Sequence, residues 1–163
     1  MQITVRRAGA ALVLAALAVA AQTTAAGAAP AHPAAATSGA AARSVLVQVD
    51  NWTQCEMDFV SASLSSGTWT GIDWPPATIT NSTWGVWQSE SNGFMTGTEG
   101  KATYQLHKCV NPADEYKWVS FHWDNPYAGS NSYDTKGTSS GVKITRSGGS
   151  GDNAVVSFVV KTG

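Results

Sequence analysis

Apolar and polar residues alternate along several short stretches of the chain. Within 44–52 a valine occupies every second position from 45 to 49, and within 102–107 apolar residues again take every second position. Because successive side chains of a strand point to opposite faces, this pattern predicts strands with one buried face. After Ser44, no window of a dozen residues has the 3.6-residue period of an amphipathic helix.

The same pattern, read together with turn signals, divides the remaining chain into short strands. Strands are predicted at 44–52, 56–63, 68–70, 77–88, 102–107, 116–124, 141–146 and 154–161. The last two would form a hairpin around a Gly- and Ser-rich turn, and 90–100 is predicted to be a loop. Short strands without helices indicate an all-β sandwich or barrel, and the lack of a fixed-period repeat argues against a propeller.

The stretch 121–134 is predicted to run from a strand into a loop. Phe121 and Trp123 would share one face of the strand, and a proline then ends its hydrogen-bonded ladder. Tyr127 and Tyr133 follow in a loop that offers them no evident core. Either their rings fold back on the sheet, or the loop is a rim that presents aromatic groups to a ligand or a membrane.

The first part of the chain has a composition unlike the rest. Residues 1–28 combine two early arginines, an unbroken apolar run and small residues at a cleavage position, which is typical of a secretory signal peptide. Residues 29–43 are rich in Ala and Pro and predict a disordered spacer. The folded domain is therefore expected to span 44–163, in a secreted protein.

The charge of that domain is negative. Seven of the chain's Lys and Arg residues and all 11 Asp and Glu residues lie within 44–163, so seven positive charges oppose 11 negative ones and the formal charge is −4. An acidic domain without a Lys/Arg cluster argues against nucleic-acid binding, and against binding to anionic lipid by charge alone.

The two cysteines, Cys55 and Cys109, are expected to form a disulfide, because an exported protein folds in an oxidising compartment. The alternative is a pair of buried free thiols. Two cysteines lack the paired spacing of a zinc site, and we expect neither a metal nor a cofactor.

Catalytic patterns are weak. Ser139 stands in a Gly-x-Ser-x-Gly sequence, but a strand is predicted after it instead of a helix. His122 and Asp124 share a strand face and could form a base–carboxylate pair, and Glu90 and Glu99 could act as paired carboxylates. Neither spacing requires catalysis, so we expect a protein that is not an enzyme.

Seven tryptophans are more than a core of this size needs, so some should be exposed. An exposed indole suits the membrane interface, and it also suits stacking on a sugar or on a cationic headgroup. The set is Trp52, Trp69, Trp74, Trp84, Trp87, Trp118 and Trp123.

Three blocks of sequence resemble the aegerolysin family. They are 90–100 (ESNGFMTGTEG), 124–134 (DNPYAGSNSYD) and 148–153 (GGSGDN). The blocks are most similar to the small component of a binary bacterial insecticidal crystal toxin. The likeness extends over about 44–162 and omits the predicted signal peptide and spacer.

The resemblance implies a single-domain antiparallel β-sandwich that binds membrane sphingolipid, such as ceramide phosphoethanolamine or sphingomyelin. It also implies a larger partner protein that forms the pore, so that the pair acts as a cytolytic or insecticidal toxin. A secreted carbohydrate-binding module that uses the same tryptophans is the alternative, and a secreted hydrolase is a third reading.

The resemblance also implies a set of lipid-binding residues, to which the exposed loop tyrosines are added. Trp69 resembles a lipid-site tryptophan of the family, Glu99 resembles its glutamate, and Trp123 and Asp124 lie in a similar Trp-Asp segment. The predicted lipid-binding residues are Trp69, Glu99, Trp123, Asp124, Tyr127 and Tyr133.

Overall fold

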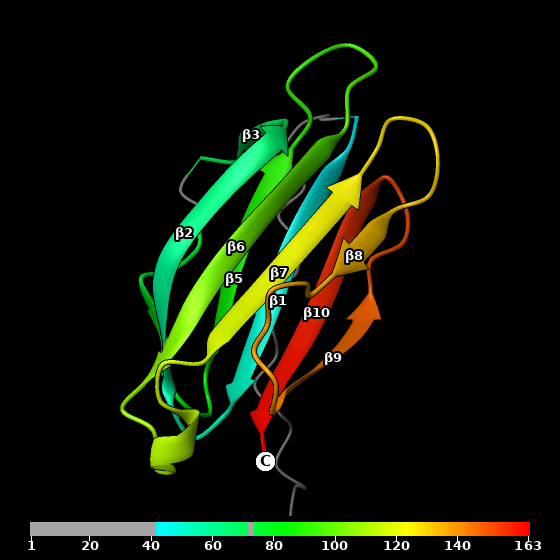
Figure 1. Cartoon of the computed structure of the whole chain (residues 1–163). Helices are drawn as coiled ribbons and strands as arrows, with labels where there is room; N and C mark the ends of the chain where they lie inside the picture. The colour runs from blue at the N-terminus through cyan, green and yellow to red at the C-terminus, as the bar shows by residue number, and fades with distance from the viewer. Residues whose placement is uncertain (1–41, 72–73) are drawn as a thin grey trace, which may run out of the picture. The chain divides into compact units, whose positions relative to one another are not determined.

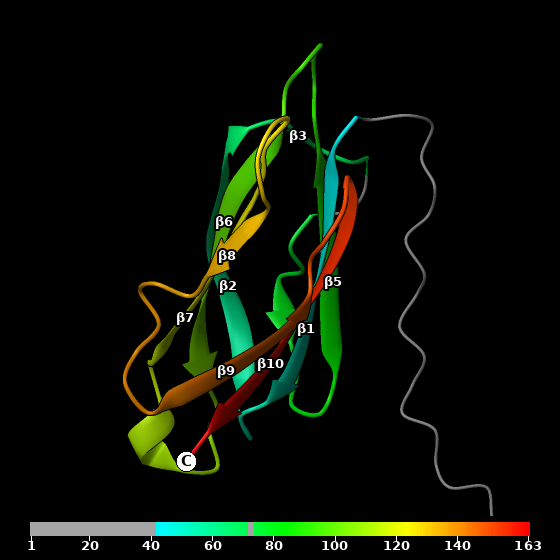
Figure 2. The same cartoon turned by 90° about the vertical axis from the view of Figure 1, so that its right-hand side faces the viewer.

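The computed structural model describes residues 42–71 and 74–163, and it confirms the predicted all-β sandwich. Two sheets pack face to face (Figures 1 and 2). One contains β3 (Thr68–Trp69), β5 (Trp84–Glu90), β1 (Ser44–Trp52), β10 (Asn153–Thr162) and β9 (Val142–Gly148), in that order. The other contains β4 (Thr78–Ile79), β2 (Glu56–Ser66), β6 (Thr98–His107), β7 (Trp118–Asn125) and β8 (Ser132–Asp134).

The strand pairs are antiparallel except for one. β1 and β10 run parallel through the middle of their sheet, with Val47 opposite Val156. A tight hairpin turn forces neighbouring strands to be antiparallel, but β1 and β10 are separated by most of the domain, so no turn fixes their direction. The sequence pattern therefore contained no signal for this pair.

The core lies between the two sheets and is rich in aromatic rings. The β1 valines predicted to face inward are fully buried. Trp87 packs against Tyr104, Phe121 and Trp123, with ring centroids 5.9–6.1 Å apart. Such aromatic pairs each add about 0.5–1.5 kcal/mol beyond the burial of their area.

Three predicted segments differ in the structure. The stretch 77–88, predicted to be one strand, is split into β4 and β5 by a turn in which Ser82 has φ 61° and donates its N–H to Asn51 O. β8 was predicted as loop; it pairs with β7 after the turn at 126–131. The predicted loop 90–100 is loop only from 91 to 97, because β5 ends at Glu90 and β6 begins at Thr98.

The predicted disulfide between Cys55 and Cys109 is present. It joins the segment before β2 to the segment after β6, beside a short 3-10 helix, η1 (Pro112–Asp114). The predicted signal peptide (1–28) and nearly all of the predicted spacer (29–43) lie outside the described residues. Among residues 42–71 and 74–163, no helix has the length and apolar character needed to cross a bilayer.

Candidate functional site

Four loops gather at one end of the sandwich, which we call the loop end (Figure 1). They connect β2 to β3, β5 to β6, β7 to β8, and β9 to β10. An open groove of about 500 Å³ lies there. Its walls are Ser66, Met95, Gly97, Thr98, Glu99, Asp124, Pro126, Tyr127 and Ala128.

Two carboxylates face each other in this groove. Glu99 at the start of β6 lies directly opposite Asp124 near the end of β7. Both belong to the outer face of their sheet, because their neighbours on β7, Trp123 and Asn125, point inward and are buried. Directly opposed side chains on neighbouring strands lie within interaction distance, so this pair concentrates negative charge at one point.

The two carboxyl groups differ in acidity. A hydrogen bond from His122 lowers the pKa of Glu99 below its ordinary value. The pKa of Asp124 is raised, first by partial burial and then by the negative charge of Glu99. The surroundings therefore favour the ionised form of Glu99 and the neutral form of Asp124.

His122 connects this pair to the neighbouring strand. Its Nε2 lies 3.1 Å from Glu99 Oε1, and its Nδ1 lies 3.4 Å from Asp134 Oδ2 on β8. The Nδ1 atom has no hydrogen bond in this arrangement. His122 thus contacts Glu99 and Asp134, so the base–carboxylate pair considered for His122 and Asp124 gains no hydrogen bond in the structure.

The glycines on either side of Thr98-Glu99 allow the strands to approach closely. A Cβ on Gly97 would lie 2.5 Å from Asn125 O, and a Cβ on Gly100 would lie 2.6 Å from the Trp123 ring. A side chain at Gly97 would therefore collide with the backbone at the end of β7, and one at Gly100 would collide with the Trp123 ring and with β2. The Gly-Thr-Glu-Gly sequence is thus a steric requirement for placing Glu99 opposite Asp124.

A buried set of hydroxyl groups supports the groove from below. Ser89 Oγ accepts hydrogen bonds from Thr98 Oγ1 at 2.7 Å and from Trp123 Nε1 at 2.8 Å. All three residues are buried. The Trp123 indole therefore links the two sheets directly beneath the carboxylates.

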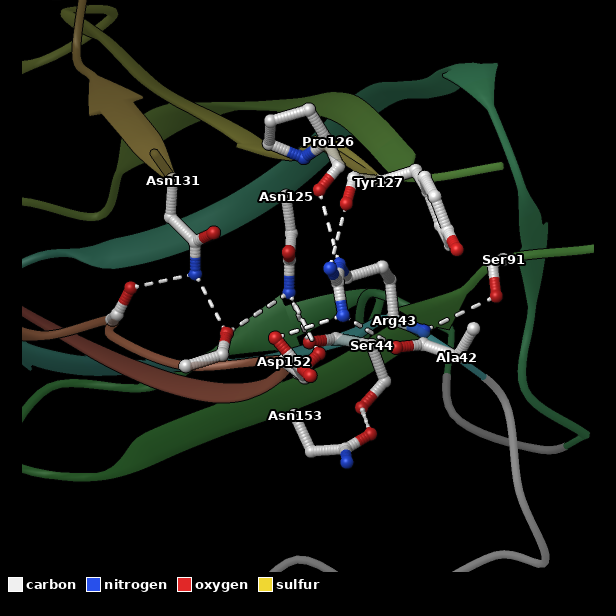
Figure 3. Close-up of polar contacts among 12 residues, drawn as sticks. Ala42, Arg43, Ser44, Ser91, Asn125, Pro126, Tyr127, Asn131, Asp152 and Asn153 are labelled. Atoms are coloured by element: carbon white, nitrogen blue, oxygen red, sulfur yellow. Dashed lines mark hydrogen bonds and ion pairs between the residues drawn. The ribbon is translucent and has the colours of Figure 1, made fainter. Parts of the chain in front are cut away.

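Arg43 holds the loops together (Figure 3). Its guanidinium donates to Pro126 O at 3.1 Å and to Tyr127 O at 2.6 Å, and it pairs with Asp152 at 2.8 Å. Its backbone exchanges hydrogen bonds with Ser91. The residue thus joins the β5–β6, β7–β8 and β9–β10 loops, and we call this set of contacts the Arg43 clamp.

Of the six predicted lipid-binding residues, three meet in the groove. Glu99, Asp124 and Tyr127 line it together, and the Tyr127 ring also lies 5.3 Å from the Arg43 guanidinium. The other three, Trp69, Trp123 and Tyr133, do not line it.

These other three rings are engaged elsewhere. Trp123 is fully buried in the core, because odd-numbered residues of β7 point inward. Trp69 packs between Trp123 and Trp74, with centroids 5.9 Å and 4.9 Å away. Tyr133 donates its hydroxyl to Gly149 O at 2.9 Å, which ties β8 to the β9–β10 turn.

Two exposed apolar residues at the loop end were missed by sequence reasoning. Phe94 and Met95 lie in the β5–β6 loop with 92% and 55% of their surface exposed. The available signal was an adjacent Phe-Met pair inside a stretch otherwise composed of small and polar residues. Two of the seven tryptophans, Trp87 and Trp123, are by contrast fully buried.

The Ser139 hydroxyl has a structural partner. Its Oγ accepts the backbone N–H of Trp118 at 2.8 Å, and its backbone N–H donates to Trp118 O. The Gly-x-Ser-x-Gly segment therefore pins the β8–β9 connection to the start of β7. No helix follows the serine, as a nucleophile elbow would require.

The comparisons with known proteins agree with this architecture. Two solved structures are similar in fold: the lipid binding protein Nakanori, with 18% identity and a TM-score of 0.60 over 72% of this chain and 70% of that one; and the RahU protein in complex with a Tris molecule, with 15% identity and a TM-score of 0.59 over 76% of this chain and 98% of that one. No curated protein is significantly similar to the chain. The aegerolysin family model matches residues 42–161, which include nine of the ten strands described above and all but the last residue of β10. The chain therefore belongs to the aegerolysin family.

Proposed function

We propose that this protein binds membrane lipid at its loop end, and that the groove holds a headgroup with a cationic amine. The observation that carries the proposal is the pair of opposed carboxylates, Glu99 and Asp124, in the wall of the groove. Membership of the aegerolysin family supports it, as does the similarity in fold to a lipid binding protein.

The electrostatics of the groove favour a cation. Two carboxylates directly opposite each other on neighbouring strands repel each other. A positive group bound between them attracts both, and this attraction offsets the repulsion. Tyr127 in the same wall adds a ring that can contact an ammonium group. A zwitterionic phospholipid carries such a group at the outermost point of its headgroup.

Within that class, we propose a sphingolipid, either ceramide phosphoethanolamine or sphingomyelin. This choice rests on the resemblance of 90–100 and 124–134 to aegerolysins, and of Trp69 and Glu99 to residues of the family's lipid site. The protein would act without enzymatic activity, since recognition alone accounts for the groove.

We also propose that the protein is secreted and works with a larger pore-forming partner. The signal-like composition of residues 1–28 and the disulfide between Cys55 and Cys109 support secretion. The partner follows from the likeness to the small component of a binary toxin. Dye release from sphingolipid vesicles should then require both proteins, and release by this protein alone would contradict the pairing.

The headgroup assignment is tested by sedimentation with vesicles. Vesicles containing sphingomyelin or ceramide phosphoethanolamine should bind the protein, and vesicles of phosphatidylglycerol, whose headgroup carries no ammonium group, should not. Glu99→Gln and Asp124→Asn should each weaken binding roughly tenfold or more, the range expected for a lost charged hydrogen bond. Asp58→Asn is the matched control, since Asp58 lies on β2 of the same sheet and does not line the groove. If the double Glu99/Asp124 variant binds like the wild type, the groove is not the headgroup site.

A sugar is the second candidate ligand, because Trp74 offers an indole that could stack on it. This ring is 54% exposed and is backed by Trp69, which would hold it rigidly. A glycan array distinguishes the two ligands. The sugar module would be favoured by glycan binding that Trp74→Ala abolishes and Glu99→Gln leaves unchanged. The absence of binding to any glycan on the array would favour the lipid.

A further inference from the structure

The β5–β6 loop projects from the loop end beyond the neighbouring connections (Figures 1 and 2). Its own hydrogen bonds define its shape: Thr96 Oγ1 donates to Gly93 O at 2.9 Å, and Asn92 Nδ2 donates to Gly67 O at 3.2 Å. Met95 has φ 57°, a left-handed conformation that non-glycine residues seldom adopt. The loop thus holds the Phe94–Met95 pair outward at the expense of backbone strain.

Both side chains of this pair are apolar, so their removal from water would be favourable. Phe94 is almost completely exposed and Met95 is more than half exposed. A single exposed apolar side chain is ordinary on a protein surface. Two adjacent ones at the end of a projecting loop, beside a groove, are a different arrangement.

The surroundings indicate which occupant the pair would meet. Met95 lines the same groove as Glu99 and Asp124. A lipid whose headgroup is held in the groove would therefore have its acyl chains next to the loop. The segment 91–98 (SNGFMTGT) contains no charged residue. Entry of this loop into the boundary of a bilayer would therefore remove no charge from water.

We propose that Phe94 and Met95 form a wedge that enters the headgroup–acyl boundary of a lipid bilayer while the groove holds the headgroup. This inference rests on the proposed lipid-binding function. Insertion is shallow, because an irregular loop carries backbone N–H and C=O groups that the hydrocarbon interior cannot satisfy. The wedge adds affinity for a membrane without adding positive charge, which suits an acidic domain.

The proposal is tested by comparing a membrane with a headgroup that has no acyl chains. Phe94→Ser should weaken binding to sphingomyelin-containing vesicles by roughly tenfold to a hundredfold, the range that follows from burying one phenylalanine side chain. Its affinity for soluble phosphocholine and phosphoethanolamine, measured by calorimetry, should stay unchanged. Phe94→Leu should retain most of the vesicle affinity.

Val110→Ser is the matched control, because Val110 is an apolar residue 76% exposed in the segment after β6, near the disulfide. It should alter neither measurement. Vesicle binding of Phe94→Ser within twofold of the wild type would overturn the wedge, and so would an equal loss of affinity for the soluble headgroups. A different result would contradict the proposed lipid-binding function itself: Glu99→Gln would leave both vesicle binding and soluble-headgroup binding intact.

Discussion

Glu99 and Asp124 carry the same formal charge, but their surroundings shift their acidities in opposite directions. The hydrogen bond from His122 favours the ionised form of Glu99, while burial and the charge of Glu99 disfavour ionisation of Asp124. At the scale of single residues, the two halves of the proposed headgroup site therefore respond differently to acid. Asp124 begins to take up a proton at a higher pH than an ordinary aspartate, and Glu99 at a lower pH than an ordinary glutamate.

These opposite pKa shifts predict acid-sensitive lipid binding. With its raised pKa, Asp124 loses its charge above the range of an ordinary aspartate, while Glu99 with its lowered pKa remains ionised. Vesicle affinity should fall as the pH is lowered from neutral to about pH 4, which is close to the ordinary pKa of a carboxyl group. Sedimentation across this range measures it, with Asp58→Asn expected to follow the wild-type curve. A flat profile would contradict a role for the Asp124 charge.

The same shift predicts that Asp124 reduces stability while serving binding. Because its pKa in the folded state is raised, ionisation of Asp124 opposes folding at neutral pH, and that cost disappears as the pH falls. Asp124→Asn should raise the free energy of unfolding at neutral pH by about 0.2–1 kcal/mol, the value of relieving a like-charge pair across strands. Urea unfolding at neutral and acidic pH checks it. A clear loss of stability at neutral pH would show that the carboxylate has a structural role.

At the scale of elements, the sequence predicted the strands better than their pairing. Apolar residues at every second position identified β1 and β6. In β6 and β10 buried residues alternate with less buried ones, whereas β1 is buried on both faces over most of its length. The parallel β1–β10 pair was not predictable from local turns, and β8 is only three residues long. The turn at Ser82 was missed because its β-branched neighbours have strand propensity, which the hydrogen bond to Asn51 overrides.

The candidate site was likewise predicted only in part. The family-like blocks predicted Glu99, Asp124 and Tyr127, which the fold brings into one groove. Trp123 was predicted at the site because of its neighbours in sequence, yet strand alternation turns it inward. Arg43 was assigned to the spacer, since the four partners that give it a role come from loops distant in sequence.

The Arg43 clamp connects three loops, so its removal should affect all of them. Arg43→Ala should lower the free energy of unfolding by about 1–3 kcal/mol and speed hydrogen exchange in 91–97 and 126–131. Arg43→Lys should restore little, because one ammonium cannot replace a planar fork that reaches several acceptors.

Arg146→Ala provides the control for the clamp. The Arg146 guanidinium donates to Gly148 O and lies over the Tyr133 ring, so it serves the neighbouring hairpin. Exchange in 91–97 should be unchanged in that variant. If Arg43→Ala leaves exchange in both loops at the wild-type rate, the clamp does not set their conformation.

At the scale of the whole domain, the two ends of the sandwich have different tasks. The groove lies where β2 ends, and the Cys55–Cys109 bond lies just before β2 begins. Eleven residues of strand separate them, a distance of about 35 Å. One end carries the partly buried carboxylates and the exposed Phe94–Met95 pair, while the other is closed by a covalent bond.

This division predicts that stability and binding can be changed independently. The disulfide spans 54 residues, and removing it as Cys55→Ala/Cys109→Ala should cost about 4 kcal/mol through the greater freedom of the unfolded chain. Below the midpoint of thermal unfolding, vesicle affinity should stay within about twofold of the wild type, because no groove residue contacts the bond. Thermal unfolding and sedimentation on one preparation give both quantities. A loss of affinity in a variant that is still folded would mean that the far end of the sandwich sets the geometry of the groove, and the two tasks would then be coupled through β2 and β6.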